Sequence, residues 1–326
     1  MTMSGLTRRT LMGGAVLALI GAQARAEDFP NRTIRIIVPW PAGGVTDIVA
    51  RLIADRLAAQ IGQAVIVENR PGASGIIGTD YVARSAPDGY TLVLVTASAQ
   101  AMGPSVLTTV PYDPVKDFAP IIQATTAPAI MVVPKELAAN NVAEFVALAK
   151  QKPGQLNFAS FGIGSSAHMA AELFMHMTGT KMVNVIYKGS APAIVDLMAN
   201  RVQVLFDSIP AALPHARAGH LKGLAVTGPA PTPAAPDLPT VAASVPGYEF
   251  TVWQGLAAPA RTPAAVIQRL YAEVAKIMAQ PDVKKILADS GAEPLSVPPD
   301  GFAAYISREN EKWRGLAKDA KISVAN

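Results

Sequence analysis

The hydrophobic and polar positions along the chain alternate between two periods. Short apolar runs at 33–39, 65–69 and 91–96 are typical of strands, and the segments between them space apolar residues as helices do. The segment 45–61 is the clearest helix, because its apolar positions share one face and Gly62 follows as a stop signal. Strands that alternate with helices predict an α/β protein with mainly parallel sheets.

The same alternation restarts after a long apolar passage at 121–133. We predict helices at 142–151, 165–178 and 191–200, and strands at 156–160, 183–187, 202–206 and 221–226. A proline-rich loop at 228–236 and a second extended passage at 249–258 come before helices at 263–280 and 300–317. Two α/β units joined by two long passages predict a two-lobed protein with two hinge crossovers. Lobe 1 would comprise 27–125 and 254–326, and lobe 2 would comprise 126–253.

The first 26 residues have the pattern of an export signal. Arg8 and Arg9 precede an uncharged apolar run, and Ala24-Arg25-Ala26 has small residues at the spacing that a signal peptidase accepts. About 12 apolar residues with two central glycines are too short for a membrane anchor, which needs about 20 residues. We therefore expect cleavage after Ala26 and a periplasmic protein. The paired arginines leave two export routes open, the general one and the twin-arginine one.

This signal accounts for most of the basic charge. The chain has 28 Lys and Arg against 24 Asp and Glu, and residues 1–26 contain three of the arginines and no acid. The remainder has 25 basic and 24 acidic groups, with no basic cluster interleaved with aromatics, so we expect no nucleic-acid partner. Zero Cys excludes disulfides, thiol catalysis and cysteinyl metal sites. The apolar fraction, 50%, is enough for real hydrophobic cores.

A glycine-rich turn between the first strand and the first helix is the strongest local candidate for a site. It reads Pro39-Trp40-Pro41-Ala42-Gly43-Gly44-Val45-Thr46-Asp47. Glycines let a ligand approach the backbone, and the start of a helix offers unpaired N–H groups with partial positive charge. The turn could thus bind an anion without a cationic side chain. The alternative is an ordinary turn in which Thr46 or Asp47 caps the helix.

A second glycine-rich turn lies at 158–168 and includes Ser160, Phe161, Gly162, Gly164, Ser165 and Ser166. It resembles a dinucleotide fingerprint, but 180–190 contains no acidic residue for a ribose, and we expect no cofactor. Its hydroxyl groups and helix start would suit a carboxylate. His168, in the first turn of the helix, could form hydrogen bonds at the rim of a pocket.

Other chemistry has less support. His168, Glu172 and His176 are spaced by four residues, but one straight helix cannot easily wrap all three around an ion, and we expect no metal site. The alternative is a hydrolase that uses Ser160 or Ser165 with His168, but the Gly-x-Ser-x-Gly elbow of such enzymes does not occur in the sequence. Asp207 follows the predicted strand 202–206, where it could contact a ligand or cap the next turn.

Taken together, the chain resembles the Bug family, the periplasmic solute receptors of tripartite tricarboxylate transporters. The resemblance covers essentially all of the chain after the signal. It rests on many short motifs in order: Pro39-x-x-x-Gly43-Gly44-x-x-Asp47, Glu68-Asn-Arg70-Pro-Gly72-Ala-Ser-Gly75-Ile-Ile-Gly78, Asp88-Gly-Tyr-Thr91-Leu, Ser160-x-Gly162-x-Gly164-Ser165-x-x-His168, Tyr187-Lys-Gly189-Ser-Ala-Pro192, Phe206-Asp207, Leu224-Ala-Val-Thr227, Pro239-Thr240 and Trp253-x-Gly255-Leu-x-Ala-Pro259.

The resemblance implies a type II periplasmic binding-protein fold with a small carboxylate held in the cleft by two glycine loops. Position by position, it implies Ala42, Gly43, Gly44 and Asp47 from lobe 1, and Ser160, Gly162, Ser165, Ser166 and His168 from lobe 2, with Asp207 at the floor. Gly164 belongs to the same motif, and Thr96 and Ser98 are added because they end the third strand. Trp40 and Phe161 stand where the family pattern is loose, and they could narrow the pocket or stack on an aromatic acid.

The sequence therefore predicts a non-enzymatic, monomeric receptor that closes on an organic carboxylate and passes it to the membrane permease subunits of a tripartite transporter. A receptor that presents its closed form to a sensor kinase would look the same in sequence. The sequence also leaves open whether the ligand is a di- or tricarboxylate, an aromatic acid or an amino acid.

Overall fold

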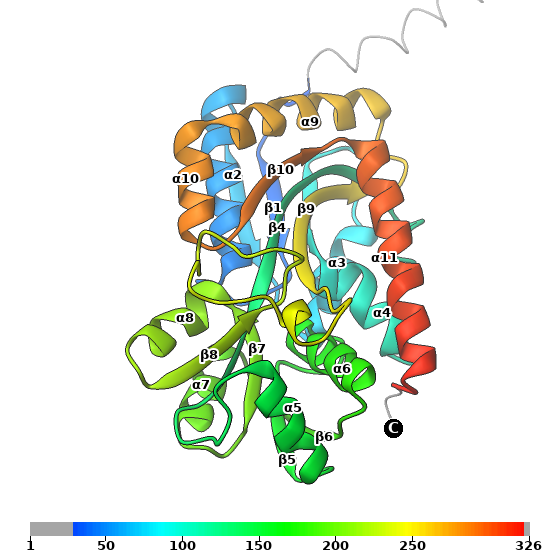
Figure 1. Cartoon of the computed structure of the whole chain (residues 1–326). Coiled ribbons are helices and arrows are strands. Elements are labelled where there is room, and N and C mark those ends of the chain that lie inside the picture. The colour runs from blue at the N-terminus through cyan, green and yellow to red at the C-terminus, as the bar shows by residue number, and fades with distance from the viewer. Residues whose placement is uncertain (1–28, 323–326) are drawn as a thin grey trace, which may run out of the picture.

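The computed structural model describes residues 29–322, which form two lobes (Figure 1). The predicted export signal lies outside the described residues. Lobe 1 contains β1 (Ile34–Val38), β2 (Val65–Asn69), β3 (Thr91–Thr96), β9 (Thr251–Pro259) and β10 (Glu293–Val297). Lobe 2 contains β5 (Leu156–Ser160), β6 (Met182–Ile186), β7 (Val204–Ser208) and β8 (Leu221–Val226). The long strand β4 (Phe118–Pro134) belongs to both lobes.

The strands follow the order β2-β1-β3-β9-β4-β7-β5-β6, with β8 and β10 also paired to β4. Each lobe has a parallel core, β2-β1-β3 in one and β7-β5-β6 in the other. The strands β4 and β9 are antiparallel to their neighbours. Up to Pro128, β4 pairs with β9, and from Ala129 onward it pairs with β7 and β8. This change of partner marks the passage between the lobes.

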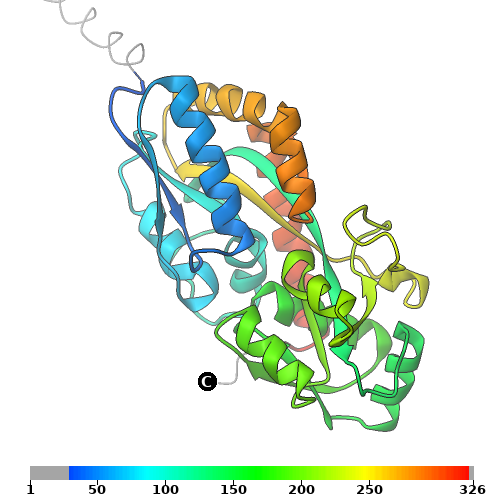
Figure 2. The same ribbon diagram turned by 90° about the vertical axis from the view of Figure 1, so that its left-hand side faces the viewer.

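Helices cover both faces of each sheet (Figures 1 and 2). In lobe 1, α2 (Val45–Ile61), α9 (Ala264–Ala279) and α10 (Pro281–Asp289) lie on one face, and α3 (Ile76–Ala83), α4 (Gly103–Val106) and α11 (Pro299–Asp319) lie on the other. In lobe 2, α5 (Val142–Gln151) and α6 (Ser166–Thr178) lie opposite α7 (Ser190–Met198) and α8 (Ile209–Arg217). The run Ile36-Ile37-Val38 is fully buried because its alternate side chains enter different cores, Ile36 and Val38 with α2 and Ile37 with α3.

Thr227 links the two crossings at the centre of the molecule. Its hydroxyl accepts a hydrogen bond from the Ala129 amide at 2.7 Å and lies 2.8 Å from the Phe250 carbonyl oxygen, to which it donates. Ala129 lies on β4, and Phe250 immediately precedes β9. The two-lobed α/β fold predicted from the sequence is thereby confirmed, while the residue boundaries of the lobes stay a prediction.

Several elements differ from the sequence prediction. The short π-helix at 98–102, together with α4, α8, α10 and β10, was not predicted. Two prolines argue against a helix at α8 in the sequence. Pro210 lies in its first turn, where a proline loses no intrahelical hydrogen bond, whereas Pro214 lies inside the helix. The predicted strand 202–206 is instead 204–208, because pairing with β4 extends as far as Ala129 opposite Ser208. Asp207 therefore lies within the strand and not after it.

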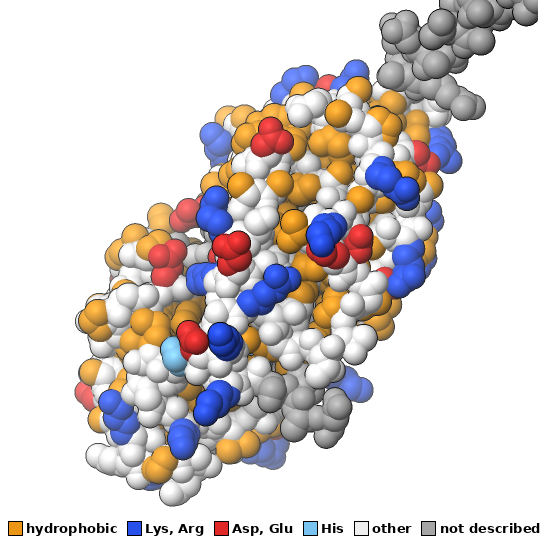
Figure 3. All heavy atoms as spheres, turned by 90° about the vertical axis from the view of Figure 1, so that its right-hand side faces the viewer, with side chains coloured by type: hydrophobic (Ala, Val, Ile, Leu, Met, Phe, Trp, Pro, Cys, Tyr) orange, Lys and Arg blue, Asp and Glu red, His pale blue; other side chains and the backbone are white. Residues whose placement is uncertain are grey.

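No helix within residues 29–322 is long and apolar enough to cross a membrane. On the face that carries α11, basic and acidic side chains are interspersed without a large area of one sign (Figure 3).

Candidate functional site

A cavity of about 920 Å³ lies between the two lobes. Lobe 1 contributes the glycine-rich turn 39–47, called the first glycine loop from here on, together with the segment 71–74 and the end of β3. Lobe 2 contributes Phe161, Ser166 and the starts of α7 and α8. Aromatic side chains from both lobes line it as well. Only two charged residues are part of this lining in the described chain, the exposed Lys188 and the buried Asp207. Polar recognition in the cavity therefore depends mainly on hydroxyl groups, amides and helix N-termini.

The first glycine loop presents its backbone to the cavity. Ala42, Gly43 and Gly44 all line it, and Gly44 is the N-cap of α2 without a side-chain cap. Among the described residues, no acceptor meets the amides of Gly44, Val45 and Thr46, which lie at the positive end of a 17-residue helix. This geometry suits an anionic oxygen, which would accept hydrogen bonds from these amides.

Asp47 does not line the cavity but holds the first glycine loop in shape. Its carboxylate accepts hydrogen bonds from the Gly43 amide at 3.0 Å, from Arg51 Nε at 2.9 Å and from Asn69 Nδ2 at 2.9 Å. Asn69 also donates to the carbonyl oxygen of Trp40. Burial alone would raise the pKa of Asp47, but the hydrogen bonds from Arg51, Gly43 and Asn69 outweigh burial and lower it. The ionised carboxylate thus fixes the loop on both sides of its glycines.

The end of β3 adds hydroxyl groups next to this loop. Trp40 Nε1 donates to Thr96 Oγ1 at 3.3 Å, so that the indole is fixed across the lobe 1 wall. Thr96 and Ser98 both line the cavity, and Ser98 Oγ has no hydrogen bond to a described residue. Both hydroxyls can donate to a ligand beside the α2 amides.

In the second glycine loop, residues 158–168, several polar groups form hydrogen bonds with other groups of the same loop. Ser165 caps α6, and its Oγ accepts from the amides of Phe161 at 3.2 Å and His168 at 3.4 Å. The Ser165 amide donates to the Gly162 carbonyl oxygen. Phe161 and Ser166 line the cavity, whereas Ser160, Gly162, Gly164, Ser165 and His168 are not part of its lining.

His168 is buried behind this loop. Its Nδ1 accepts from the Gly164 amide at 3.4 Å, and its Nε2 lies 3.5 Å from Glu172 Oε1. Burial lowers the pKa of His168 to about 4, so its ring is neutral at pH 7, and burial raises the pKa of Glu172. No hydrogen bond joins the ring to a serine hydroxyl among the described residues. This arrangement supports the glycine loop rather than a nucleophile.

The second glycine loop is part of a close contact between the lobes. Gly164 lies against Gly103 of lobe 1, where a Cβ on Gly164 would come within 2.6 Å of the Gly103 Cα. Nearby, Ser74 Oγ donates to the Ile163 carbonyl oxygen at 2.9 Å. Elsewhere on the rim, Gly291 of lobe 1 lies against Ile209 of lobe 2. A Cβ added to Gly291 would lie 3.1 Å from the Cβ of Ile209. These glycines permit the lobes to approach closely around the cavity.

The wall of lobe 2 uses the starts of α7 and α8 instead. Gly189 and Ser208 are the N-caps of these helices, and no side chain within residues 29–322 caps either helix. Ser190, Asp207 and Ser208 line the cavity together with Lys188. Burial raises the pKa of Asp207 to about 6, against the opposing effect of hydrogen bonds from Ser190 and Ser208.

Nine of the site residues predicted from the sequence line the cavity: Trp40, Ala42, Gly43, Gly44, Thr96, Ser98, Phe161, Ser166 and Asp207. The predicted site did not include the other lining residues with polar side chains, nor the N-cap Gly189; these side chains are Thr46, Ser74, Thr125, Tyr187, Lys188, Ser190, Ser208, Trp253, Gln254 and Ser290. Gly189 had a usable signal, since it also stands between a strand and a helix. Ser74 had a similar signal, since its segment, with Gly72 and Gly75, also stands between a strand and a helix. Gln254 had none, because it lies inside a strand and only the packing of the lobes brings it to the cavity.

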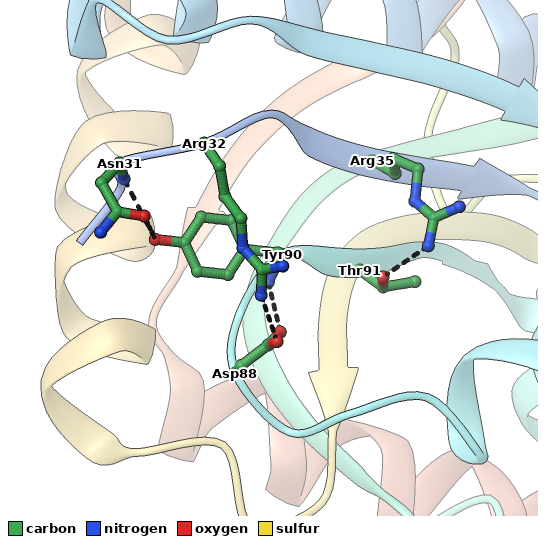
Figure 4. Close-up of polar contacts among 6 residues, drawn as sticks. All are labelled: Asn31, Arg32, Arg35, Asp88, Tyr90 and Thr91. Atoms are coloured by element: carbon green, nitrogen blue, oxygen red, sulfur yellow. Dashed lines mark hydrogen bonds and ion pairs between the residues drawn. The ribbon is translucent and has the colours of Figure 1, made fainter.

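A smaller hollow of about 250 Å³ lies elsewhere, beside the N-terminal ends of β1 and β3. Arg32 Nη2 donates to Asp88 Oδ2 at 2.6 Å and its guanidinium stacks on Tyr90, while Arg35 Nη2 lies 3.4 Å from Thr91 Oγ1 (Figure 4). These arginines already have partners, in contrast to the amides of the first glycine loop. Within residues 29–322, no three His, Asp or Glu side chains are grouped to hold a metal ion.

With this geometry established, comparison with known proteins identifies the relatives of the chain. Residues 49–322 match the family described as the tripartite tricarboxylate transporter family receptor, TctC. The chain belongs to this family. The BugT protein of Bordetella pertussis is 35% identical over 318 residues, which cover 96% of this chain and 98% of BugT. The family resemblance predicted from the sequence motifs is thus confirmed.

Solved structures of TctC-family relatives share the fold. Rpa4515 of R. palustris, solved with adipate, superimposes with a TM-score of 0.84 at 38% identity, over 90% of this chain and 99% of that one. MatC (Rpa3494) of Rhodopseudomonas palustris, solved with bound malate, gives a TM-score of 0.80 at 31% identity, over 88% and 99% of the two chains. Both relatives therefore hold organic carboxylates in the same fold.

Proposed function

We propose that this chain is a periplasmic receptor that binds a small organic carboxylate in the cavity between its lobes and delivers it to the membrane subunits of a tripartite tricarboxylate-type transporter. The observation that carries this proposal is the cavity itself. It combines unpartnered amides at the start of α2 with neighbouring hydroxyls and has Lys188 as its one cationic lining residue in the described chain. The TctC-family relatives solved with adipate and malate support the ligand class.

In this mechanism the carboxylate replaces water at the start of α2. The amides of Gly44, Val45 and Thr46 supply hydrogen bonds and partial positive charge, and Thr96 and Ser98 supply further donors. A ligand that also contacts Ser166 and the wall of lobe 2 stabilises the closed arrangement, because only that arrangement brings both sets of groups together. We infer no catalytic step, and we expect the receptor to act as a monomer.

Binding is tested by calorimetry and thermal shift with dicarboxylates, tricarboxylates, aromatic acids, amino acids and neutral sugars. We expect at least one organic acid to bind and to raise the melting temperature, whereas the sugars do not. Binding of a neutral sugar with no response to any carboxylate would overturn the proposal. Delivery is tested by deleting the gene and measuring uptake of the identified acid. Normal uptake with lost transcriptional induction would instead indicate a sensory receptor.

A further inference from the structure

Asp207 has one carboxylate oxygen with partners and one without. Oδ1 accepts a hydrogen bond from Ser190 Oγ at 3.0 Å and from the Ser208 amide at 2.7 Å. Oδ2 is buried and has no hydrogen-bond partner among the described residues. The residue is 4% exposed, and it lines the cavity between the lobes.

The residues of the described chain around Asp207 supply no partner for Oδ2. Its neighbours along β7 are Phe206 and Ser208, and Ile130 lies opposite on β4. No Lys, Arg or His of the described chain lies within ion-pair distance of its carboxylate. A buried polar atom without a partner destabilises the protein, and more so when it carries charge. A donor on the ligand would remove this penalty.

We propose that Asp207 Oδ2 accepts a hydrogen bond from a hydroxyl or ammonium group of the ligand, so that the receptor prefers organic acids with such a donor to plain carboxylates. The inference rests on the proposed function, since it assigns the second polar group of the same ligand. The carboxylate would bind at the α2 amides of lobe 1, and the donor would bind at Asp207 of lobe 2. One ligand thereby forms hydrogen bonds with the unpaired groups of both lobes.

The preference follows from the cost of a missing partner. A plain acid leaves Oδ2 unpaired in the closed cavity, and a second carboxylate at that position would face a like charge. The pKa of Asp207, raised to about 6 by burial, still leaves the group mainly ionised at pH 7.5, where it can only accept.

Asp207→Asn should reverse this preference. The hydroxyl of Ser190 and the amide of Ser208 both donate, so the single oxygen of asparagine is held where Oδ1 now lies. The amide NH₂ then takes the place of Oδ2 and presents donors to the cavity. The variant should disfavour ligand hydroxyl and ammonium groups and favour a second carboxylate.

The experiment is calorimetry at pH 7.5 with two matched series of acids. One series is succinate, malate and aspartate, and the other is adipate, 2-hydroxyadipate and 2-aminoadipate. For the wild type we expect a donor-bearing acid to bind at least about 10-fold more tightly than the plain acid of its series, the scale of one satisfied hydrogen bond to a charged group. The hydroxy and amino members show which donor is recognised. In Asp207→Asn the ratio should fall to one or below.

Asp237→Asn is the matched control, because Asp237 is exposed in lobe 2 and is not part of the cavity lining. It should keep the wild-type ratio. Equal binding of plain and donor-bearing acids by the wild type would overturn the inference without any variant, and so would an unchanged ratio in a folded Asp207→Asn. Either result leaves the carboxylate receptor intact, whereas the absence of any carboxylate binding overturns both proposals.

Discussion

The two glycine loops look alike in the sequence and differ in the structure. Each follows a strand, contains two glycines and opens a helix of more than ten residues. The loop before α2 lines the cavity with its backbone, and no described side chain caps its helix. The loop before α6 is capped by Ser165, and Gly164 is packed against Gly103 of the opposite lobe.

The difference shows that a glycine-rich turn has two separate physical uses. Missing Cβ atoms expose amides to a ligand in the first loop, and they permit contact between two backbones in the second. The choice between these two uses depends on which amide donates to the acidic or hydroxyl side chain of the turn. Asp47 accepts from Gly43, before the helix, and leaves the first helical amides free, whereas Ser165 accepts from the His168 amide inside the helix.

Gly164→Ala should have the largest effect. The new Cβ would lie 2.6 Å from the Gly103 Cα in the arrangement of the lobes seen here, and the backbone of Gly103 has little room to adjust. We expect affinity for the carboxylate ligand to fall about 100-fold, because the apparent affinity decreases with the population of the closed state. Calorimetry measures the affinity, and small-angle scattering measures the closure.

Gly179→Ala is the matched control for this variant. Gly179 also has a left-handed backbone, at φ 66°, but a Cβ there meets nothing within 4 Å. Both variants pay about 1 kcal/mol of backbone strain, so only Gly164→Ala should lose affinity. Equal affinities would show that the contact between the lobes does not control closure.

Asp47→Asn should have an intermediate effect on the first glycine loop. Asparagine cannot accept all the hydrogen bonds from Gly43, Arg51 and Asn69. We expect about 10-fold weaker carboxylate binding and a loss of about 2 kcal/mol in the free energy of unfolding at pH 7, typical of hydrogen bonds to a charged group. Denaturant melts and calorimetry measure the two quantities.

The stability part of this effect should depend on pH. The folded pKa of Asp47 is lowered, so its contribution is fully present above the unfolded value of about 3.9 and is lost as the pH falls through the folded pKa. The stability difference between wild type and Asp47→Asn should therefore be constant from pH 8 to 5 and shrink below pH 4. Asp55→Asn, an exposed change on the same helix, should show neither effect. A difference that grows on acidification would contradict the assigned role.

Ser165→Ala and Ser166→Ala should give the smallest and most informative pair of effects. Ser165 caps α6 without lining the cavity, and Ser166 lines it. We expect Ser165→Ala to lower stability by about 1 kcal/mol with affinity nearly unchanged. Ser166→Ala should weaken binding a few-fold at nearly unchanged stability. The opposite assignment in thermal melts and titrations would mean that the second loop binds the ligand through Ser165.

Much of the secondary structure could be predicted from the sequence, because it depends on local patterns. The helix 45–61 and the strands 65–69, 91–96 and 156–160 have the predicted bounds. Apolar periodicity and stop signals such as Gly62 act within a few residues of the chain. The predicted bounds were wrong where contacts with distant residues determine the end of an element. For β7, pairing with β4 extends the strand to Ser208.

The sequence by itself determined the two α/β units and the glycine turn that opens α2, and its export signal stays a prediction. Only the tertiary structure decided which candidate groups have free hydrogen-bonding capacity. Ser165 and His168 form hydrogen bonds within their own loop, while one oxygen of Asp207, a residue that lines the cavity, has no partner in the described part of the chain. The physical reason is that residue types define which hydrogen bonds are possible, but the packing of two lobes defines which of them are already made.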